Sequence, residues 1–293
     1  MLKIENLNKT YPGNIKALIN VSISIRKGIF GLIGPNGSGK SSLMRTIATL
    51  QEPDTGSIEF DDLNVLKQKH EMRKVLGYLP QEFGVYPTVT AENLMHHLAV
   101  LKGVVDRKQR EEHVSYLLEL TNLSAHRKKR LGGFSGGMKQ RFGIAQALLG
   151  KPRIIILDEP TAGLDPHERN RFHNLLSELG ENITIILSTH IIADVKELCN
   201  NMAIIKKGKI VFQTTPNRAV DSFENKIWSK VVSRSEAQLF SEKFNVISSR
   251  LQYGQILLKI LSDDQPPGFD HVNPNLEDVY FSYMGVGKET AQR

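Results

Sequence analysis

A glycine-rich octapeptide near the N-terminus has the residue types and spacing that wrap a backbone around phosphate. It matches the pattern G-x-x-x-x-G-K-[ST] and consists of Gly34, Pro35, Asn36, Gly37, Ser38, Gly39, Lys40 and Ser41. Glycines let the backbone turn its N–H groups toward an anion, and the helix that follows presents the positive end of its dipole to the same charge. We expect Lys40 to reach the β- and γ-phosphates and the Ser41 hydroxyl to bind Mg²⁺. Ser42 opens the following helical pattern and belongs to the same predicted site.

Two acids follow a short apolar run that has the composition of a buried strand. Residues 154–157 precede Asp158 and Glu159, and neighbouring side chains on a strand point to opposite sides. We expect Asp158 to hold Mg²⁺ and Glu159 to polarise the water that attacks the γ-phosphate. For this pair alone, an exposed acidic turn before Pro160 would be the favoured interpretation. The phosphate loop elsewhere in the chain favours the catalytic one.

His190 follows a second apolar run of the same kind. Ser188, Thr189 and His190 come directly after residues 183–187, and ligands of parallel sheets bind at the carboxyl ends of the strands. We therefore expect His190 beside the bound ligand, although a lone histidine is usually structural. Other histidines lie in helical patterns without such neighbours and are assigned to the surface or to packing, among them His96, His97 and His113.

Strand patterns predict the layers that must position these residues. Apolar and polar residues alternate over residues 19–25, which predicts an antiparallel β-layer near the N-terminus. The runs at 29–33, 154–157 and 183–187 are almost entirely apolar, as are parallel strands that helices cover on both faces. The sequence thus predicts an α/β fold, a phosphate-loop nucleoside triphosphatase (P-loop NTPase) core with a parallel sheet and an N-terminal antiparallel layer.

Helical spacing replaces the strand signal between residues 82 and 150, which predicts a helical subdomain inserted into the sheet domain. The expected helices cover residues 91–101, 107–120 and 138–149. After about residue 220 the pattern changes again to a small α+β appendage. Its expected strands are 227–232, 246–251 and 256–261, with a helix at 236–244. We therefore predict a nucleotide-binding domain over residues 1–219 and an accessory region over 220–293.

The composition excludes several classes of protein. Of the 293 residues, 40% are hydrophobic and 24% charged, which is typical of globular domains and argues against disorder. No apolar run is long enough to cross a bilayer, and residues 1–6 lack the apolar core of a secretion signal, so we expect a cytoplasmic protein. The single cysteine, Cys199, excludes an internal disulfide and a cysteine-rich metal site. The net charge of +7 would suit nucleic acid, anionic lipid or solubility alike.

A second glycine-bearing helix start carries the most specific signal in the chain. Within the segment 134–141, the Ser135 hydroxyl and the free N–H groups of Gly136 and Gly137 suit a γ-phosphate. This segment resembles the signature motif of the ATP-binding cassette (ABC) family, which other phosphate-loop ATPases lack. Phe134 stands where the family usually has leucine, and Ser42 where threonine is commoner, but neither change affects the expected phosphate contacts.

The resemblance spans residues 1 to about 215 and follows the family's order of motifs. These are Tyr11, the phosphate loop, Gln81, the signature, Asp158 with Glu159, the segment 162–165, and His190. It implies that Tyr11 stacks on adenine and that Asp165 couples two ATP sites. It also implies that His190 contacts the γ-phosphate, and that Gln81 senses Mg²⁺ and relays closure to the segment Glu82 to Leu94.

These implied roles complete the predicted site. We expect Glu159, His190 and Gln81 to be catalytic, and Ser41, Gln81 and Asp158 to bind the metal. In the family, the signature of one subunit closes over ATP held by the phosphate loop of another, in a head-to-tail dimer. This chain alone would then supply half of each of two composite sites.

The resemblance further implies an ATPase subunit that drives separate transmembrane subunits from the cytoplasmic face of the cell membrane, together with an identical or different second ATP-binding subunit. The implied membrane-facing segment includes Phe83, Val85 and Tyr86. The tail 273–280 is similar to that of cassettes from the multidrug and ABC-2-type exporter branch, which favours export. A short capping helix with Val279 and Phe281 buried would explain the same residues. The cargo and the membrane partner cannot be read from this sequence.

Two other classes of protein share parts of this pattern. A soluble cassette ATPase acting on ribosomes or nucleic acid would suit the basic pI near 9.3, but such proteins resemble two fused cassettes or carry long coiled coils. This chain shows neither, so we expect no nucleic-acid partner. A phosphate-loop GTPase or small-molecule kinase would share only residues 34–41. Guanine recognition usually needs Asn-Lys-x-Asp, and Asn8-Lys9 and Asn225-Lys226 both lack the aspartate.

Overall fold

The computed structural model describes residues 1–81 and 83–285, which form two units divided between Ile210 and Val211. The sequence predicts a boundary near residue 219, inside helix α8 (Pro216–Asp221), and the domain limits 1–219 and 220–293 stay a prediction. Glu82, in the predicted helical subdomain and membrane-facing segment, and residues 286–293 of the predicted accessory region lie outside the described residues.

The antiparallel layer predicted near the N-terminus is present as a four-stranded sheet. Its strands pair in the order β2-β1-β4-β5, all antiparallel. They are β1 (Leu2–Tyr11), β2 (Ile15–Ile25), β4 (Thr55–Phe60) and β5 (Leu63–Asn64). Val21, Ile23 and Ile25 of β2 are buried and the serines between them are exposed, as the alternation predicts. Strand β1 of this layer ends at Tyr11, which is the first residue of the predicted site along the chain.

The parallel core predicted from the apolar runs is also confirmed. Six strands pair in the order β10-β9-β3-β8-β7-β6, and β9, β3, β8, β7 and β6 pair parallel. They are β3 (Gly28–Ile33), β6 (Leu76–Leu79), β7 (Ile154–Asp158), β8 (Thr184–Thr189), β9 (Asn201–Lys206) and β10 (Lys209–Thr214). Ile33 pairs with Thr189, and Asp158 with Ser188. The segments that follow β3, β7 and β8 therefore leave the sheet at the same edge.

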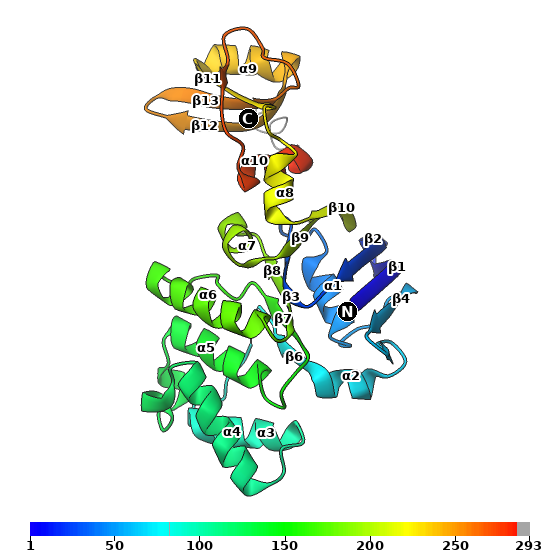
Figure 1. The fold of residues 1–293 in the computed structure, drawn as a ribbon, viewed down its shortest axis with the longest axis vertical. Coiled ribbons are helices and arrows are strands. Elements are labelled where there is room, and N and C mark those ends of the chain that lie inside the picture. The colour runs from blue at the N-terminus through cyan, green and yellow to red at the C-terminus, as the bar shows by residue number, and fades with distance from the viewer. Residues whose placement is uncertain (82, 286–293) are drawn as a thin grey trace. The chain divides into compact units, whose positions relative to one another are not determined.

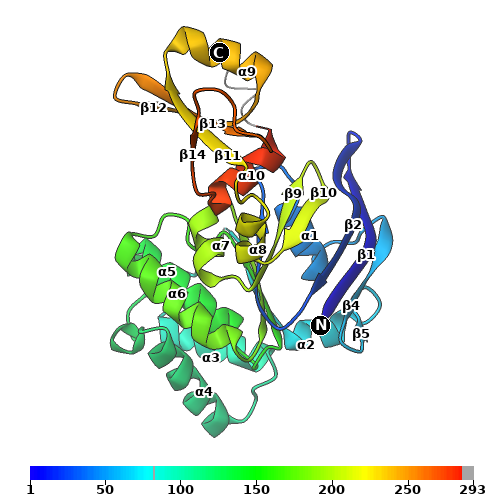
Figure 2. The ribbon, with the colours of Figure 1, turned by 45° about the horizontal axis from the view of Figure 1, so that its top comes forward.

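Helices cover both faces of this sheet. Helix α1 (Lys40–Ile47) lies on the face toward the antiparallel layer, whereas α6 (Pro166–Gly180) and α7 (Ile192–Leu198) lie on the other (Figures 1 and 2). Helix α2 (Lys69–Val75) precedes β6. A hydrophobic core joins the two sheets with α1, and includes Leu2, Ile4, Phe30, Met44, Phe60 and Ile156. Its burial holds the loop between β3 and α1 against the rest of the unit.

Between β6 and β7 the described chain is helical, apart from a single bridge between Thr90 and Arg130. It forms α3 (Ala91–Leu101), α4 (Arg107–Leu120) and α5 (Gly136–Ala147), with 3₁₀ turns at Ser124–His126 and Leu131–Gly133. The helices begin at side-chain caps, Thr90, Asp106 and Ser135, each of which accepts a backbone N–H three residues on. Helices α3 and α4 have the predicted limits, and α5 begins two residues before the predicted 138.

The second unit is a small α+β structure. An antiparallel sheet of order β12-β13-β11-β14 packs against α9 (Arg234–Lys243). Its strands are β11 (Ile227–Val232), β12 (Asn245–Gln252), β13 (Gln255–Leu261) and β14 (Asp270–His271). The tail forms α10 (Leu276–Met284), capped by Asn275. Val279 is buried in it and Phe281 is half-buried, so the alternative of a short capping helix that buries both is met at Val279 alone.

No helix among the described residues is long and apolar enough to span a bilayer.

Candidate active site

The phosphate loop connects β3 to α1 and needs glycine at two positions for different reasons. Gly39 has a φ of 111°, which L side chains rarely adopt. A Cβ at Gly34 would lie 2.4 Å from the carbonyl oxygen of Ile205, so only glycine fits against β9 there. The Ser38 hydroxyl is buried, with no hydrogen-bond partner among the described residues. Because burying an unpaired hydroxyl is costly, this group is suited to a ligand in the loop.

Lys40 lies at the base of the loop with its ammonium group buried. Its Nζ donates to the carbonyl oxygens of Gly34 (2.7 Å) and Pro35 (3.2 Å) and lies 3.9 Å from Oε1 of Glu159. Burial lowers the pKa of Lys40, and the negative charges of Glu159 and Asp158 oppose that effect. The cation is therefore held where it can neutralise an anion bound in the loop.

The carboxylate of Glu159 gathers side chains from three other segments. Gln81 Nε2 donates to its Oε2 at 3.3 Å, and His190 Nδ1 lies 3.2 Å from the same oxygen. With Lys40 at 3.9 Å from Oε1, all three catalytic candidates and the loop lysine meet at one group. The Glu159 side chain is 8% exposed, whereas that of His190 is 49% exposed. The cluster is thus buried on the sheet side and open on the histidine side.

The backbone at Glu159 is strained in a way that fixes this carboxylate. Its φ is 51°, and its N–H donates to the carbonyl oxygen of Ser188 at 2.8 Å, which ties the end of β7 to β8. A non-glycine residue in this conformation costs on the order of 1–3 kcal/mol, and such strain clusters at functional sites. The conformation turns Glu159 toward Gln81 and His190 rather than along the strand.

Asp158 ends β7 with an unpaired buried oxygen. Its Oδ1 has no hydrogen-bond partner among the described residues, and neither has the hydroxyl of Ser188, with which it pairs in the sheet. The described residues contain no group of three or more His, Cys, Asp and Glu side chains that could hold a metal by themselves. Magnesium, however, is commonly held by one or two carboxylates together with substrate phosphates. One unpaired carboxylate oxygen, with the Ser41 hydroxyl at the start of α1, fits that chemistry.

Tyr11 is anchored to the helix that follows the phosphate loop. Its hydroxyl donates to Oε1 of Gln51 at 2.7 Å and lies 3.2 Å from the hydroxyl of Ser42. Gln51 in turn donates to the carbonyl oxygen of Ser42 and to the hydroxyl of Thr46, both at 2.8 Å. The ring is therefore held at a fixed place beside α1. Sequence reasoning missed Gln51, because its contact with Tyr11, 40 residues away in the chain, forms only through the fold.

The signature residues begin α5 and are not part of the Glu159 cluster. Ser135 caps the helix by accepting the N–H of Met138 at 3.2 Å, and nothing lies within 4 Å of a Cβ built at Gly136. Ser135 and Gly136 are exposed, and no hydrogen bond or ion pair in the described chain joins them to the phosphate loop. Phe134, the departure from the family pattern, is buried edge-on against Phe142. It fills the apolar position that leucine would.

Asp165 is likewise exposed and forms the cap of α6. Its side chain accepts the N–H of Glu168 at 2.9 Å. Glu168 lies 3.4 Å from Arg141 of α5, and a Cβ at Gly137 would meet its side chain at 3.1 Å. The start of α6 and the start of α5 are thus held together, so a shift of either helix would move both Asp165 and the signature.

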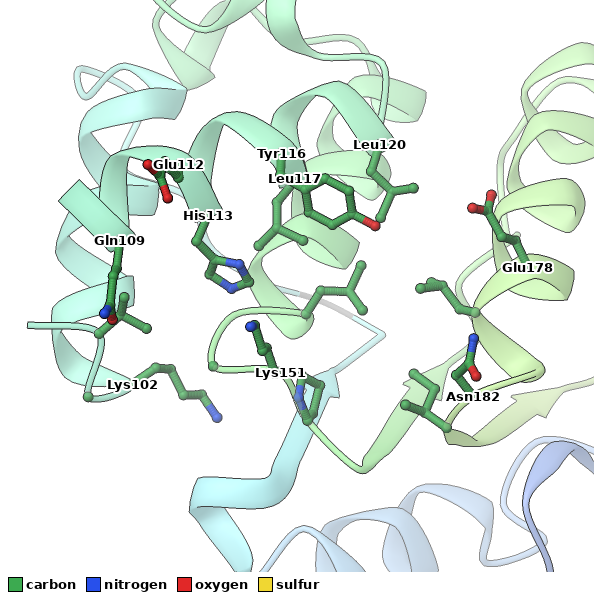
Figure 3. A pocket seen from close by; sticks show the side chains of 17 residues that line it. Lys102, Gln109, Glu112, His113, Tyr116, Leu117, Leu120, Lys151, Glu178 and Asn182 are labelled. Carbon is green, nitrogen blue, oxygen red and sulfur yellow. The ribbon is translucent and has the colours of Figure 1, made fainter. Parts of the chain in front are cut away.

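A cavity of about 870 Å³ lies apart from these residues (Figure 3). It is lined by α4, the end of α5 and the end of α6, with Lys102, His113, Tyr116 and Glu178 among its side chains. Burial and nearby Lys151 lower the pKa of His113. None of the predicted site residues lines this cavity. Its mixture of basic and acidic groups defines no single ligand.

Sheet, loop and carboxylates together define a phosphate-loop nucleoside triphosphatase, with the loop after one core strand and the acids at the tip of another. The profile of the ABC transporter family matches residues 18–162. YxlF of Bacillus subtilis, an uncharacterised ABC transporter ATP-binding protein, is 32% identical over 97% of this chain and 99% of its own. The chain belongs to this family and is an ATP-binding and ATP-hydrolysing subunit of an ABC transporter.

Other relatives are named for multidrug transport and for methionine import. YbhF of Escherichia coli, a probable multidrug ABC transporter ATP-binding protein, is 29% identical over 97% of this chain, which spans 52% of YbhF. A methionine import ATP-binding protein of Enterococcus faecalis is 32% identical over 97% of this chain and 78% of its own. Among solved structures, the dimeric post-hydrolysis state of the cassette MJ0796 with ADP and phosphate has a TM-score of 0.67 and 28% identity, covering 73% of this chain and 98% of that one.

Proposed function

We propose that the chain drives an exporter and hydrolyses ATP at the Glu159 cluster, on the cytoplasmic face of the membrane. The observation that carries the proposal is the meeting of Lys40, Gln81 and His190 at one buried carboxylate. An incidental surface cluster of charges would not need a strained, buried glutamate at its centre.

Each residue then has a distinct part in hydrolysis. The loop N–H groups and Lys40 bind the phosphates and neutralise their charge. Glu159 polarises the attacking water and accepts its proton as the water oxygen bonds to the γ-phosphorus and the bond to ADP breaks. His190, the open-sided member of the cluster, contacts the γ-phosphate, and Gln81 keeps the Glu159 carboxylate aimed. ADP and inorganic phosphate are the products.

Three residues would hold the magnesium ion that accompanies ATP. They are Ser41 at the start of α1, Asp158 with its unpaired Oδ1, and Gln81, whose Nε2 is engaged by Glu159 and whose carbonyl oxygen is then the atom for a cation. When bound, the ion neutralises charge on the β- and γ-phosphate oxygens.

The exposed signature implies that a second ATP-binding subunit completes the site. Ser135 and Gly136 present an exposed helix start, with open space around Gly136, which suits phosphate, yet they are unconnected to the phosphate loop of their own chain. The structural relative MJ0796 is dimeric in its state with ADP and phosphate. We therefore place the signature of one subunit over the ATP held by Lys40 of the other, with Asp165 between the two sites.

The segment that follows Gln81 supplies a route from a membrane partner to the signature. Tyr86 is 67% exposed, which suits an apolar contact with a transmembrane subunit. The backbone carbonyls of Pro87 and Val89 accept the N–H groups of Gly132 and Leu131, each at 3.0 Å. A Cβ at Gly132 would lie 2.9 Å from the Pro87 oxygen, so the segments that contain Pro87 and Gly132 are in close contact. Movement at Tyr86 would thus reach the 3₁₀ turn directly before the signature.

Apolar surface in the same unit supports separate membrane subunits as partners. A groove of about 300 Å³ is lined by Leu50 and Leu101, both exposed. Purifying the chain from detergent-solubilised membranes and identifying the co-purified integral protein tests this partnership. Recovery of ribosomes or nucleic acid in place of an integral protein would contradict it.

Export is favoured by the α10 tail and by the naming of YbhF for multidrug transport, although import relatives also match. Because the cassette marks the cytoplasmic face, vesicles with the cassette outside should accumulate cargo when ATP is added outside. A lipophilic cationic dye is a suitable probe. ATP-driven loss of preloaded dye from such vesicles would instead indicate import.

The substitution Glu159→Gln tests the proposed site. It keeps the shape and the contact with Gln81 but removes the proton acceptor, so turnover should fall on the order of 10²-fold or more while ATP affinity is retained. Phosphate release and titration with a fluorescent ATP analogue measure the two quantities. The variant should also accumulate an ATP-bound dimer on gel filtration. Turnover close to that of the unmodified chain would remove Glu159 from the proposed role.

A further inference from the structure

A fully buried carboxylate outside the Glu159 cluster joins three segments of the chain. Asp194, in the first turn of α7, has no exposed surface. Its Oδ2 accepts the hydroxyl of Thr161 at 2.5 Å, and its Oδ1 accepts Nε of Arg169 at 2.7 Å. His173 Nε2 lies 2.8 Å from the same Oδ1. Three side chains from two other segments therefore converge on one acid.

The network reaches both proposed catalytic residues, Glu159 through Thr161 and His190 through Asp194 itself. Only Pro160 separates Thr161 from Glu159, and the N–H of Ala162 donates back to the Glu159 carbonyl oxygen at 3.3 Å. Asp194 itself lies one helical turn after His190, on the helix that His190 precedes. The bond between Thr161 and Asp194 thus links the backbone that carries Glu159 to the backbone that carries His190.

The remaining arms lead to α6, which begins at Asp165. Arg169 and His173 lie one and about two turns after Asp165, on the helix that Asp165 caps. His173 is held from its second ring nitrogen as well, by Glu197 of α7 at 2.9 Å. The network therefore fixes α6 against α7 and, through α6, the position of Asp165.

Stability alone is a weak explanation for these contacts. An aspartate in the first turn of a helix is favourable, but only by about 0.3–1 kcal/mol at exposed sites. Burying an ion pair such as Asp194 with Arg169 often contributes no net stability compared with apolar residues of the same volume. What the arrangement does supply is a fixed geometry between elements, which apolar packing enforces less strictly.

We infer that Asp194 is a positioning residue for hydrolysis, which sets the separation of Glu159 and His190 through Thr161 and carries the position of Asp165 to both through α6. In this role Asp194 acts through its side-chain partners and not through contact with ATP. The inference rests on the proposed catalytic roles of Glu159 and His190.

The sharpest test removes one hydroxyl. Thr161→Val keeps the volume but loses the hydrogen bond to Asp194, and Thr161→Ser keeps the bond. We expect kcat to fall about tenfold in the valine variant with KM for ATP within about twofold, since a small misplacement of reacting groups is costly. The serine variant should restore most of kcat. Thr121→Val is the matched control, because Thr121 is equally buried but its hydroxyl binds only the carbonyl oxygen of Leu117 in its own helix.

Several outcomes overturn the inference. Unchanged kcat in Thr161→Val, a serine variant as slow as the valine variant, or an equal loss in Thr121→Val would each do so. A fall in thermal stability and ATP affinity that accounts for the whole loss would show a merely structural role. Asp194→Asn keeps the size but has a single acceptor oxygen, so it cannot accept from both Thr161 and Arg169, and it should be slowed without loss of ATP binding.

A double-mutant cycle separates positioning from general damage. If Thr161 acts through His190, the effect of Thr161→Val on kcat should shrink when His190 is already alanine, whereas additive effects would contradict the inference. Glu159→Gln measured alongside distinguishes the two levels of the account. Loss of turnover there, with no effect of Thr161→Val, refutes the positioning role alone. Retained turnover in Glu159→Gln refutes the proposed site itself.

Discussion

The Glu159 cluster and the signature helix start differ in how far one chain completes them. Glu159 is buried and contacted by Lys40, Gln81 and His190, all from its own chain. Ser135 and Gly136 are exposed; Ser135 caps its own helix, and Gly137 lies against Glu168 of α6. Both belong to proposed phosphate sites, yet only the Glu159 cluster has its partners within one chain.

We infer from this difference that hydrolysis is controlled by the site that one chain leaves incomplete. A site complete within one chain would cleave ATP whenever it bound it. A site that lacks its second phosphate clamp until another subunit arrives can make hydrolysis depend on dimer closure. The links from Pro87 to Gly132 and from Arg141 to Glu168 put the incomplete half, rather than the complete one, next to the routes by which closure would be transmitted.

Gly136→Asp should have the largest effect on ATP turnover, because it alters the half of the site that one chain leaves incomplete. The new side chain has open space and an acid is tolerated in the first turn of α5, so folding should be unaffected. It would, however, place negative charge where the other subunit's γ-phosphate is expected, and turnover should fall on the order of 10²-fold. ATP affinity of the isolated chain, measured by fluorescent-nucleotide titration, should not change. Gly136→Ala is the size control, and a large loss of affinity in the aspartate variant would contradict the division of labour.

Lys40→Ala should show the opposite pattern, because it removes the cation of the half-site that one chain completes. Loss of charge-assisted contacts to phosphate should weaken ATP binding roughly 10- to 100-fold. Lys102→Ala is a matched control. Lys102 also has a pKa lowered by burial and also donates to two backbone carbonyls, those of Arg73 and Leu76, but away from the loop. Equal affinities for ATP in the two variants would show that the loop lysine has no special part.

Tyr11→Phe should have the smallest effect on ATP affinity, and it tests whether the hydrogen bonds of Tyr11 help to bind the adenine base. It keeps the ring but loses the hydrogen bonds to Gln51 and Ser42 that hold the ring beside α1. About 1 kcal/mol of positioning would be lost, which corresponds to roughly fivefold weaker ATP binding. Tyr253→Phe, at a tyrosine exposed in the second unit, is the control. Unchanged affinity in Tyr11→Phe would show that the anchor does not matter.

Sequence patterns predicted the parts of this site whose partners are close in the chain. The phosphate loop and the acids after β7 follow from glycine spacing and strand ends, and the helices α3 and α4 follow from helical spacing of their residues. The edge at which Glu159 and His190 meet follows from the rule that parallel strands present their carboxyl ends together.

The rest depended on contacts between distant segments, which periodicity does not encode. Gln51 reaches Tyr11 across the layer, and Asp194 collects Thr161 and His173 from elements far away in the sequence. Each is a single polar residue in an unremarkable local pattern. Only the packing of α6 and α7 on the sheet reveals that Asp194 is buried and shared. The roles of the site residues stay predictions until the variants above are measured.

The most direct test asks whether the phosphate loop of one chain meets the signature of another. Two differently tagged chains, one with Asn36→Cys and one with Gly136→Cys, both carrying Glu159→Gln, would be mixed and treated with a short bifunctional maleimide. Cys199 is buried and burial raises the pKa of its thiol, so the introduced cysteines should react selectively. The account predicts a covalent dimer of the two tags only when ATP and magnesium are present. Cross-linking that is absent with ATP, or equally strong without ATP, would contradict the account. So would cross-linking in a sample that contains only one of the two variants.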